Sequence, residues 1–131
     1  MTTVINTDFP RPNADQLAAF KTASTALIYQ AVGQRGALNS AIKPLRSGFR
    51  LLGAAFTAAG FPGDNLTVAG VEISPGDVIV GDDDGVIAIP YALLDDTIAR
   101  LRQLQEEKTR LLHRFSSTAP PEDWQALKAW E

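Results

Sequence analysis

The residues best suited to hold a small acid are Gly63, Asp64 and Asn65, in the run FPGDNL. Their backbone amides, together with a polar side chain, can hold a carboxylate. Gly, Asp and Asn are also the usual residues of a plain turn. From its residue types alone, the run is therefore either a binding loop or an ordinary turn.

A second candidate is the acidic run of Asp82, Asp83 and Asp84, followed by Gly85. Clustered carboxylates attract hard cations, but this run lacks the alternating spacing of a calcium loop. It separates two β-type runs, where an Asp-Gly pair is typical of a hairpin turn. We therefore predict a turn here and assign no metal ligands.

Three further ionisable residues lie near the C-terminus. Glu106 and Arg110 are four positions apart on a predicted helix, in the order that favours an ion pair, and such patterning is typical of a solvated helix face. His113 is the only histidine, and no carboxylate or serine partner accompanies it in the sequence. We expect it to have a packing or surface role.

Composition excludes several classes of protein. The chain of 131 residues has a net charge of −3, which argues against a nucleic-acid partner or an acidic membrane surface. It has no cysteine, so disulfides and thiolate metal sites are excluded. No signal peptide and no apolar run of about 18 residues is present, so no membrane partner and a cytoplasmic location are expected.

Periodicity and turn residues predict one α/β domain over residues 1–131. Two helices are expected within 13–33, capped by Asn13 and Ser24, and the strands within 48–89. A long helix is predicted over 90–116 and a terminal helix over 119–130. Apolar residues at helical spacing share one face of the long helix, namely Leu94, Ile98, Leu101, Leu104, Leu111 and Phe115.

The strands are expected to differ in burial. The run FRLLGAAFTAAGF, which begins at Phe49, is small and apolar and favours a strand buried on both faces. TVAGVEI, DVIV and VIAIP are three β-type runs separated by SPGD and GDDDG, which are turn sequences. We predict a three-strand β-meander from them.

Three segments resemble the family of regulator of ribonuclease activity A, which includes the 4-hydroxy-4-methyl-2-oxoglutarate aldolases. They are STALIYQAVGQRGALNSAIKPL, GAAFTAAGFPGDNL and TVAGVEISPGDVIVGDDDGVIAIP, and the similarity covers roughly residues 24–115. The resemblance implies a lyase that acts on pyruvate-type 2-oxo acids and decarboxylates oxaloacetate. It also implies Mg²⁺ or another divalent metal, and a homo-oligomer, either a trimer or a hexamer.

The resemblance also implies roles for individual residues. Gly63, Asp64 and Asn65 would hold the substrate carboxylate, with Asp64 directed toward metal-bound water. Glu106, or Glu107 in the alternative alignment, lies where the family carries an acid that reaches into a neighbouring subunit's site. Glu106 and Asp64 are therefore the predicted catalytic residues.

Two departures from the family pattern argue against activity in the isolated chain. Family members have a long central region after PGDNL, with an Arg-Asp pair that clamps the substrate and holds the metal. Here PGDNL is followed at once by the run TVAGVEI, which begins at Thr67. No arginine in the sequence is directly followed by an aspartate. Gln30 also stands where the family has an acid. The chain's own metal ligands are therefore missing from the family's positions.

Three hypotheses follow for function. The first is a lyase of this family that is impaired or inactive as an isolated chain. The second is a non-catalytic binding or regulatory remnant, resembling the family members that mask a ribonuclease. The third is a truncated gene product without its own role. Loss of central strands would expose sheet edges, so we predict a homo-oligomer.

Overall fold

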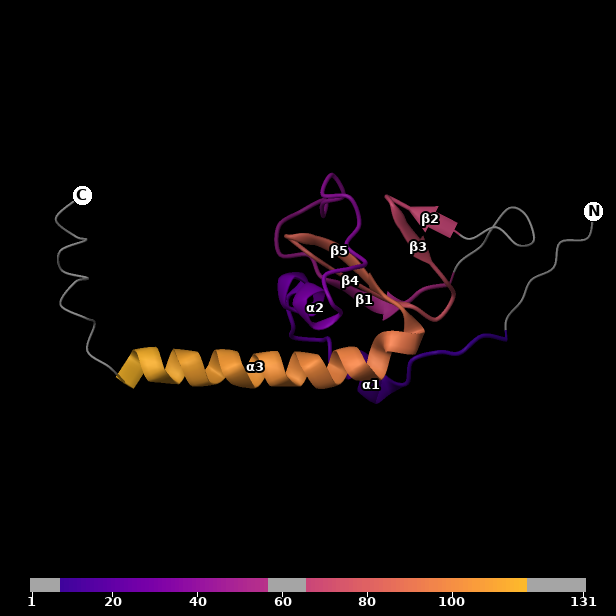
Figure 1. Cartoon of the computed structure of the whole chain (residues 1–131). Helices are drawn as coiled ribbons and strands as arrows, with labels where there is room; N and C mark the ends of the chain where they lie inside the picture. The colour runs from indigo at the N-terminus through magenta and orange to yellow at the C-terminus, as the bar shows by residue number, and fades with distance from the viewer. Residues whose placement is uncertain (1–7, 57–65, 118–131) are drawn as a thin grey trace, which may run out of the picture. The chain divides into compact units, whose positions relative to one another are not determined.

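The computed structural model describes residues 8–56 and 66–117. The chain divides into two compact units, residues 1–101 and residues 102–131. Within the described residues, the elements of the first unit are two short helices, five strands, a 3₁₀ turn and the start of a long helix, and that helix continues into the second unit (Figure 1). The α/β class and the long C-terminal helix agree with the sequence prediction. One domain over 1–131 stays a prediction.

Both N-terminal helices begin at the predicted caps. In α1 (Ala14–Ala18) the Asn13 side chain accepts from the Gln16 amide, and the Gln16 side chain accepts from the Asn13 amide, which makes a complete capping box. In α2 (Thr25–Ala31) the Ser24 hydroxyl accepts from the Leu27 amide. Gly33 follows the α2 C-cap residue with φ of 88°, a conformation that glycine adopts without strain.

The main sheet has the order β1 (Leu51–Ala54), β4 (Val78–Asp82), β5 (Gly85–Ile89), and both pairings are antiparallel. A separate hairpin joins β2 (Leu66–Val68) to β3 (Val71–Ile73). The expected single run over 67–73 was therefore wrong. Ala69 and Gly70 both have positive φ and fold the run back on itself, and β3 does not pair with β4.

The prediction that the first strand is buried on both faces was also wrong. Only one face of β1 reaches the core, through Leu52, whereas Leu51 is 48% exposed. β1 is an edge strand, and within the described residues its one strand partner is β4. Small apolar residues can line such an edge as well as a fully covered strand, so composition did not separate the two cases.

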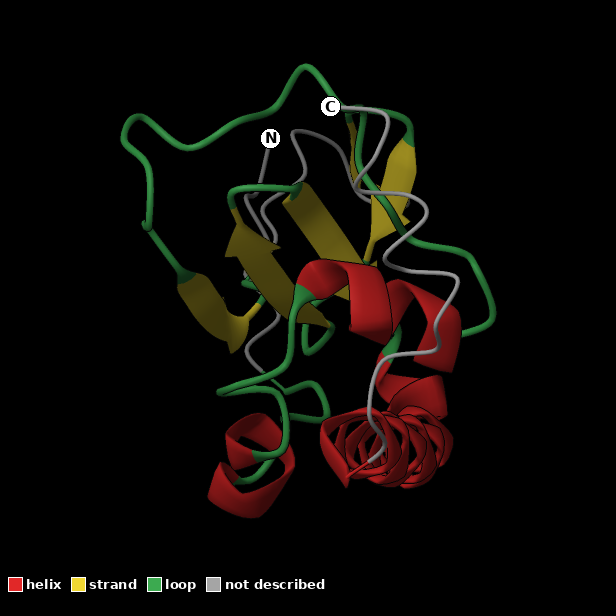
Figure 2. Ribbon diagram, turned by 90° about the vertical axis from the view of Figure 1, so that its left-hand side faces the viewer, coloured by secondary structure: helices red, strands yellow, loops and turns green. Residues whose placement is uncertain are grey.

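The core of the first unit lies between the sheet and the helices (Figure 2). One face of β4 and β5 contributes Val78, Val80, Ile87 and Ile89. α2 packs on both strands. The opposing side is formed by buried residues of α2, α3 and the segments that follow α1 and α2, namely Phe20, Ala23, Ile28, Val32, Leu94, Ile98 and Leu101.

The long helix begins as predicted, but its apolar face is only partly buried. After a 3₁₀ turn, Tyr91–Leu93, α3 spans Leu94–Ser117. Its apolar residues are buried as far as Leu101, whereas Leu111 and Phe115 are 51% and 73% exposed. The predicted apolar stripe is therefore buried only in its first part, which belongs to the first unit.

Candidate functional site

The predicted site residues fall largely outside the described part of the chain. Gly63, Asp64 and Asn65 lie in the undescribed segment 57–65, so their roles stay predictions. Glu106 lies on α3 in the second unit, where its side chain is exposed, as is that of Glu107. Gln30 is exposed on α2.

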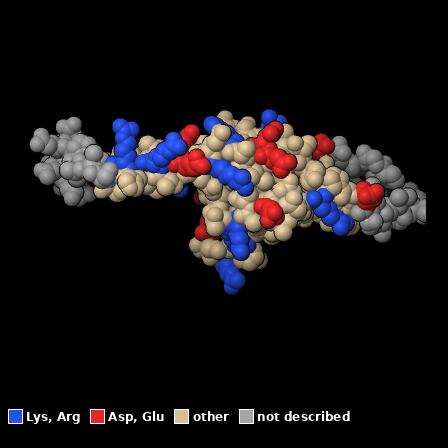
Figure 3. Space-filling view, turned by 90° about the horizontal axis from the view of Figure 1, so that it is seen from below, with Lys and Arg blue, Asp and Glu red and all other residues tan. Residues whose placement is uncertain are grey.

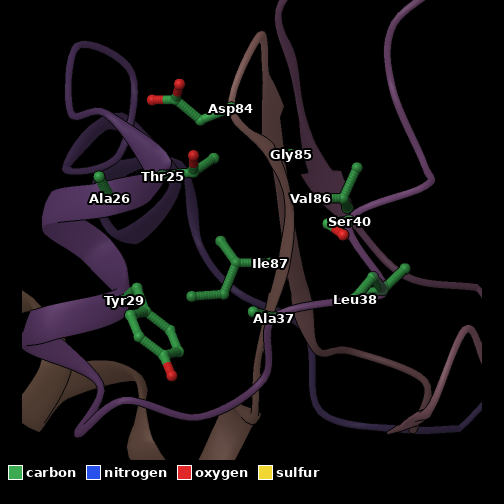
Figure 4. Close-up of a pocket in the computed structure, with 10 residues that line it drawn as sticks. All are labelled: Thr25, Ala26, Tyr29, Ala37, Leu38, Ser40, Asp84, Gly85, Val86 and Ile87. Carbon is green, nitrogen blue, oxygen red and sulfur yellow. The ribbon is translucent and has the colours of Figure 1, made fainter.

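A hollow of about 230 Å³ lies between α2, the loop that follows it, and β5 (Figure 4). Ile87 faces its middle, with Tyr29 of α2 below and the Asp84 carboxylate at the upper rim in this view. The remaining lining residues are Thr25, Ala26, Ala37, Leu38, Ser40, Gly85 and Val86. Sequence reasoning did not find this hollow, because no local pattern places residues 37–40 against β5.

The chemistry of the hollow is that of an apolar surface with a few polar groups. The hydroxyls of Tyr29 and Ser40 and the Asp84 carboxylate supply its hydrogen-bonding capacity. Among the described residues that line it, none is Lys, Arg or His. A dicarboxylate would meet a negative charge at Asp84, and the cation beside that residue is Lys43, whose ammonium donates to the Asp84 carbonyl at 2.8 Å.

The wall of the hollow is fixed by Asp82, whose carboxylate anchors the start of α2. Its Oδ2 accepts from the Thr25 amide at 2.8 Å and its Oδ1 from the Thr25 hydroxyl at 2.7 Å. The Asp84 amide also donates to Oδ1, at 2.9 Å. Burial raises the pKa of Asp82, but these hydrogen bonds outweigh burial and hold the pKa below its usual value.

We expect Asp82→Asn to lower the free energy of unfolding by about 1–2 kcal/mol near neutral pH, as for loss of a helix cap. Because the folded-state pKa is depressed, this stabilisation is complete above the unfolded-state pKa of about 3.9 and is lost as pH falls through the folded-state value. Urea unfolding near neutral pH and at about pH 3 measures both effects. The difference between the wild type and the variant should shrink at the lower pH.

Asp84→Asn is the matched control, since it removes the same charge from the same hairpin. The backbone carbonyl of Asp84 accepts a hydrogen bond from the Lys43 ammonium, and the substitution keeps that bond because it changes only the side chain. An equal loss of stability in both variants would contradict the anchoring role of Asp82.

The acidic run forms the turn that its sequence predicted. Asp83 and Asp84 connect β4 to β5 as a two-residue hairpin loop. Asp83 also holds the loop before β1, because its carboxylate accepts from the Gly48 amide at 2.9 Å and from the Ser47 hydroxyl at 3.1 Å.

Asp83→Ala should therefore lower stability modestly, by about 1 kcal/mol, and leave divalent-metal affinity unchanged. Calorimetric titration of both proteins with Mg²⁺ or Mn²⁺ measures the second quantity. A binding isotherm in the wild type that the substitution abolishes would make the run a metal site.

The described residues do not fit a divalent metal. Mg²⁺ takes carboxylate oxygens that are free to coordinate, together with water. Both oxygens of Asp82 and Asp83 accept protein hydrogen bonds, as do those of Asp77, which bond the Ser74 and Tyr91 amides. Over residues 8–56 and 66–117, no group of three His, Asp or Glu side chains is placed to hold a metal ion.

The surface carries charges of both signs. In Figure 3 the basic and acidic side chains are interspersed with uncharged surface over the face in view. Of the helices within the described ranges, none is long and apolar enough to cross a membrane.

Comparison with known proteins supports the class of fold and gives a partial relative. No family model matches the chain. A crystal structure of an uncharacterized protein from Pseudomonas syringae pv. tomato superposes with a TM-score of 0.71 at 15% identity, covering 85% of this chain and 96% of that one. At this identity the likeness shows the α/β fold alone.

A curated protein from Halalkalibacterium halodurans, named "Putative 4-hydroxy-4-methyl-2-oxoglutarate aldolase", is 42% identical over 73 residues. The match takes in 54% of this chain and 35% of that protein. The chain therefore matches about a third of the length of this relative.

Proposed function

We propose that the chain is a shortened member of the 4-hydroxy-4-methyl-2-oxoglutarate aldolase family and that its lyase activity is impaired or absent in isolation. The family part rests on the 42% identity to the curated relative over 73 residues. It is supported by the α/β fold and by the retained motifs from STALIYQAVG to VIVGDDDGVIAIP. A central segment missing after Leu66, and a cytoplasmic location, are parts of the same proposal.

The main support for the proposed loss of activity is that the chain lacks chemical groups that the reaction needs. Cleavage of a 2-oxo acid leaves an enolate, so a cation must stabilise the developing negative charge. The sequence has no Arg-Asp pair. Among the described residues, no Lys, Arg or His lines the hollow, and the nearby Lys43 ammonium is bonded to the Asp84 carbonyl. The Asp82 and Asp83 carboxylates accept hydrogen bonds from the backbone of the fold.

We expect calorimetric titration of the chain with pyruvate, in the presence of Mg²⁺, to show no saturable binding. Two charge-assisted contacts are missing, those of the family's arginine and of its metal aspartate. Titration without Mg²⁺ is the control for heats of dilution. Saturable, metal-dependent binding would contradict the proposal, and its loss in Asp64→Asn would place the site at that residue.

A binding or regulatory role is the second candidate, favoured by the exposed apolar residues around β1. Phe49, Leu51 and Phe56 are 49%, 48% and 63% exposed, beside a strand whose outer edge carries no strand partner in the described ranges. Such an edge can add a strand from a partner. Inhibition of a ribonuclease by the purified chain, lost in Leu51→Lys, would support this role over catalysis.

The same edge supports self-association. An uncovered strand edge favours pairing with another chain. We therefore propose a homo-oligomer, a trimer or hexamer by family resemblance, with β1 or α3 at the interface. Light scattering at micromolar protein concentration tests the assembly, and a stable monomer would contradict it.

A further inference from the structure

The second half of α3 presents an apolar stripe that lies entirely within the second unit. Leu104, Lys108, Leu111 and Phe115 recur at alternating spacings of four and three residues, which matches the a/d spacing of a helix pair over fewer than two heptads, with Lys at one of the four positions. Leu104 is half-buried, whereas Leu111 and Phe115 are 51% and 73% exposed. Leu112, beside the stripe, is 61% exposed. Uncharged surface lies beside the basic side chains on this part of the helix (Figure 3).

The charges along one side of this stripe are self-complementary. At 100° per residue, Glu107 and Arg114 lie on the same flank, one heptad apart. The other flank carries Gln105 and Leu112. In an antiparallel pair of identical helices, like flanks face each other, so Glu107 of each copy meets Arg114 of the other.

The same antiparallel register also places the apolar residues of the two helices opposite one another. Leu104 lies opposite Phe115 of the second copy, and Lys108 lies opposite Leu111, where its aliphatic stem can pack while its ammonium reaches water. The opposed helix dipoles add a small favourable term.

The parallel arrangement is disfavoured by the same residues. It would place Lys108 against Lys108 in the seam, and it would set Glu107 against the apolar Leu112 of the other helix. We propose that residues 104–115 of α3 pair with the same residues of a second copy, antiparallel and about a two-fold axis. This interface is independent of the proposed lyase family, and it requires an even number of subunits, such as a dimer or two trimers joined as a hexamer.

Charge reversal tests the pairing in the full chain. Glu107→Arg places Arg against Arg at two symmetry-related positions, so we expect the two-fold contact to weaken by roughly tenfold. The double variant Glu107→Arg/Arg114→Glu restores both opposite-charge pairs and should recover most of the affinity. Sedimentation velocity over a concentration series measures the association constant.

Arg110→Glu is the control, because it reverses one charge on the side of the helix away from the stripe. It should leave association unchanged. A wild-type chain that stays monomeric at every concentration, or a purely trimeric one, would overturn the proposal. So would equal weakening by Arg110→Glu and Glu107→Arg, or a double variant no better than the single one.

Cysteine cross-linking tests the orientation. The chain has no cysteine, so any disulfide comes from the introduced residues. We expect oxidation of a mixture of Lys108→Cys and Leu111→Cys chains to form the mixed cross-linked dimer, because these positions face each other in the antiparallel register. Rapid cross-linking of Lys108→Cys with itself, and no mixed product, would indicate the parallel arrangement and contradict the proposal.

Discussion

Gly36→Ala is expected to lower the free energy of unfolding by about 2–4 kcal/mol, the sum of backbone strain and overpacking. Gly36 has φ of 80°, and a Cβ there would lie 2.2 Å from the carbonyl oxygen of Ala88. That oxygen belongs to the β5 backbone, so it cannot rotate away as a flexible side chain could. Chemical denaturation of the purified variant measures the loss.

The substitution should also change the hollow, because Gly36 holds the loop after α2 against the edge of β5 that does not pair with β4. Its carbonyl accepts from the Ala88 amide at 2.8 Å, and the Leu38 amide donates to the Val86 carbonyl at 2.9 Å. Ala37 pairs with Ile87 between them. Displacing this segment would open the wall of the hollow, so faster amide exchange at Leu38 and Ala88 should accompany the lost stability.

Gly48→Ala is the control that distinguishes the steric clash of a Cβ from the strain of a positive φ. Gly48 has nearly the same φ, 79°, but a Cβ there would meet no atom within 4 Å. It should therefore cost only about 1 kcal/mol, the penalty of a left-handed conformation for a residue with a Cβ. Equal losses at Gly36 and Gly48 would mean that the loop does not pack on β5 as described.

Locally encoded features of the fold could be predicted from the sequence. Asn13 and Ser24 cap helices because a short polar side chain before a helical run satisfies the first free amides. The turn at Asp83 and Asp84 follows from turn residues between two β-type runs. Each of these features depends on neighbours within a few positions along the chain.

Features that depend on distant partners could not be predicted. The pairing of residues 36–38 with β5 joins segments about fifty positions apart, and no periodicity records it. The β2–β3 hairpin is a local feature, but it was missed because its turn places Ala69, not a glycine, at φ of 47°. The role of Asp82 as an anchor for α2 was hidden by the two aspartates that follow it, since all three suit a turn equally well.

The candidate site residues also differ in whether the sequence near them could have predicted them. Asp64 and Glu106 were chosen through family resemblance, and nothing local to either residue requires a catalytic role. Glu106 is an exposed helix residue four positions before Arg110, as its charge pattern alone would predict. The hollow beside Tyr29 and Asp84 is assembled from three separate segments, so only the folded chain defines it.

The second large effect concerns catalysis. The isolated chain should decarboxylate oxaloacetate no faster than Mg²⁺ does in buffer alone. Removal of a single preorganised group that stabilises charge in the transition state costs about 10²–10³ in rate. The sequence has no Arg-Asp pair, and Gln30 stands where the family has an acid, so losses at more than one contact are expected together.

Pyruvate release from oxaloacetate, followed with a coupled lactate dehydrogenase assay in the presence of Mg²⁺, tests the central claim most directly. Parallel reactions without protein give the rate due to the metal alone, and reactions with EDTA give the metal-free rate. The proposal of a family scaffold without its own lyase activity predicts that adding the chain leaves the metal-only rate unchanged. A rate proportional to protein concentration, abolished by EDTA and lowered by Asp64→Asn, would contradict it.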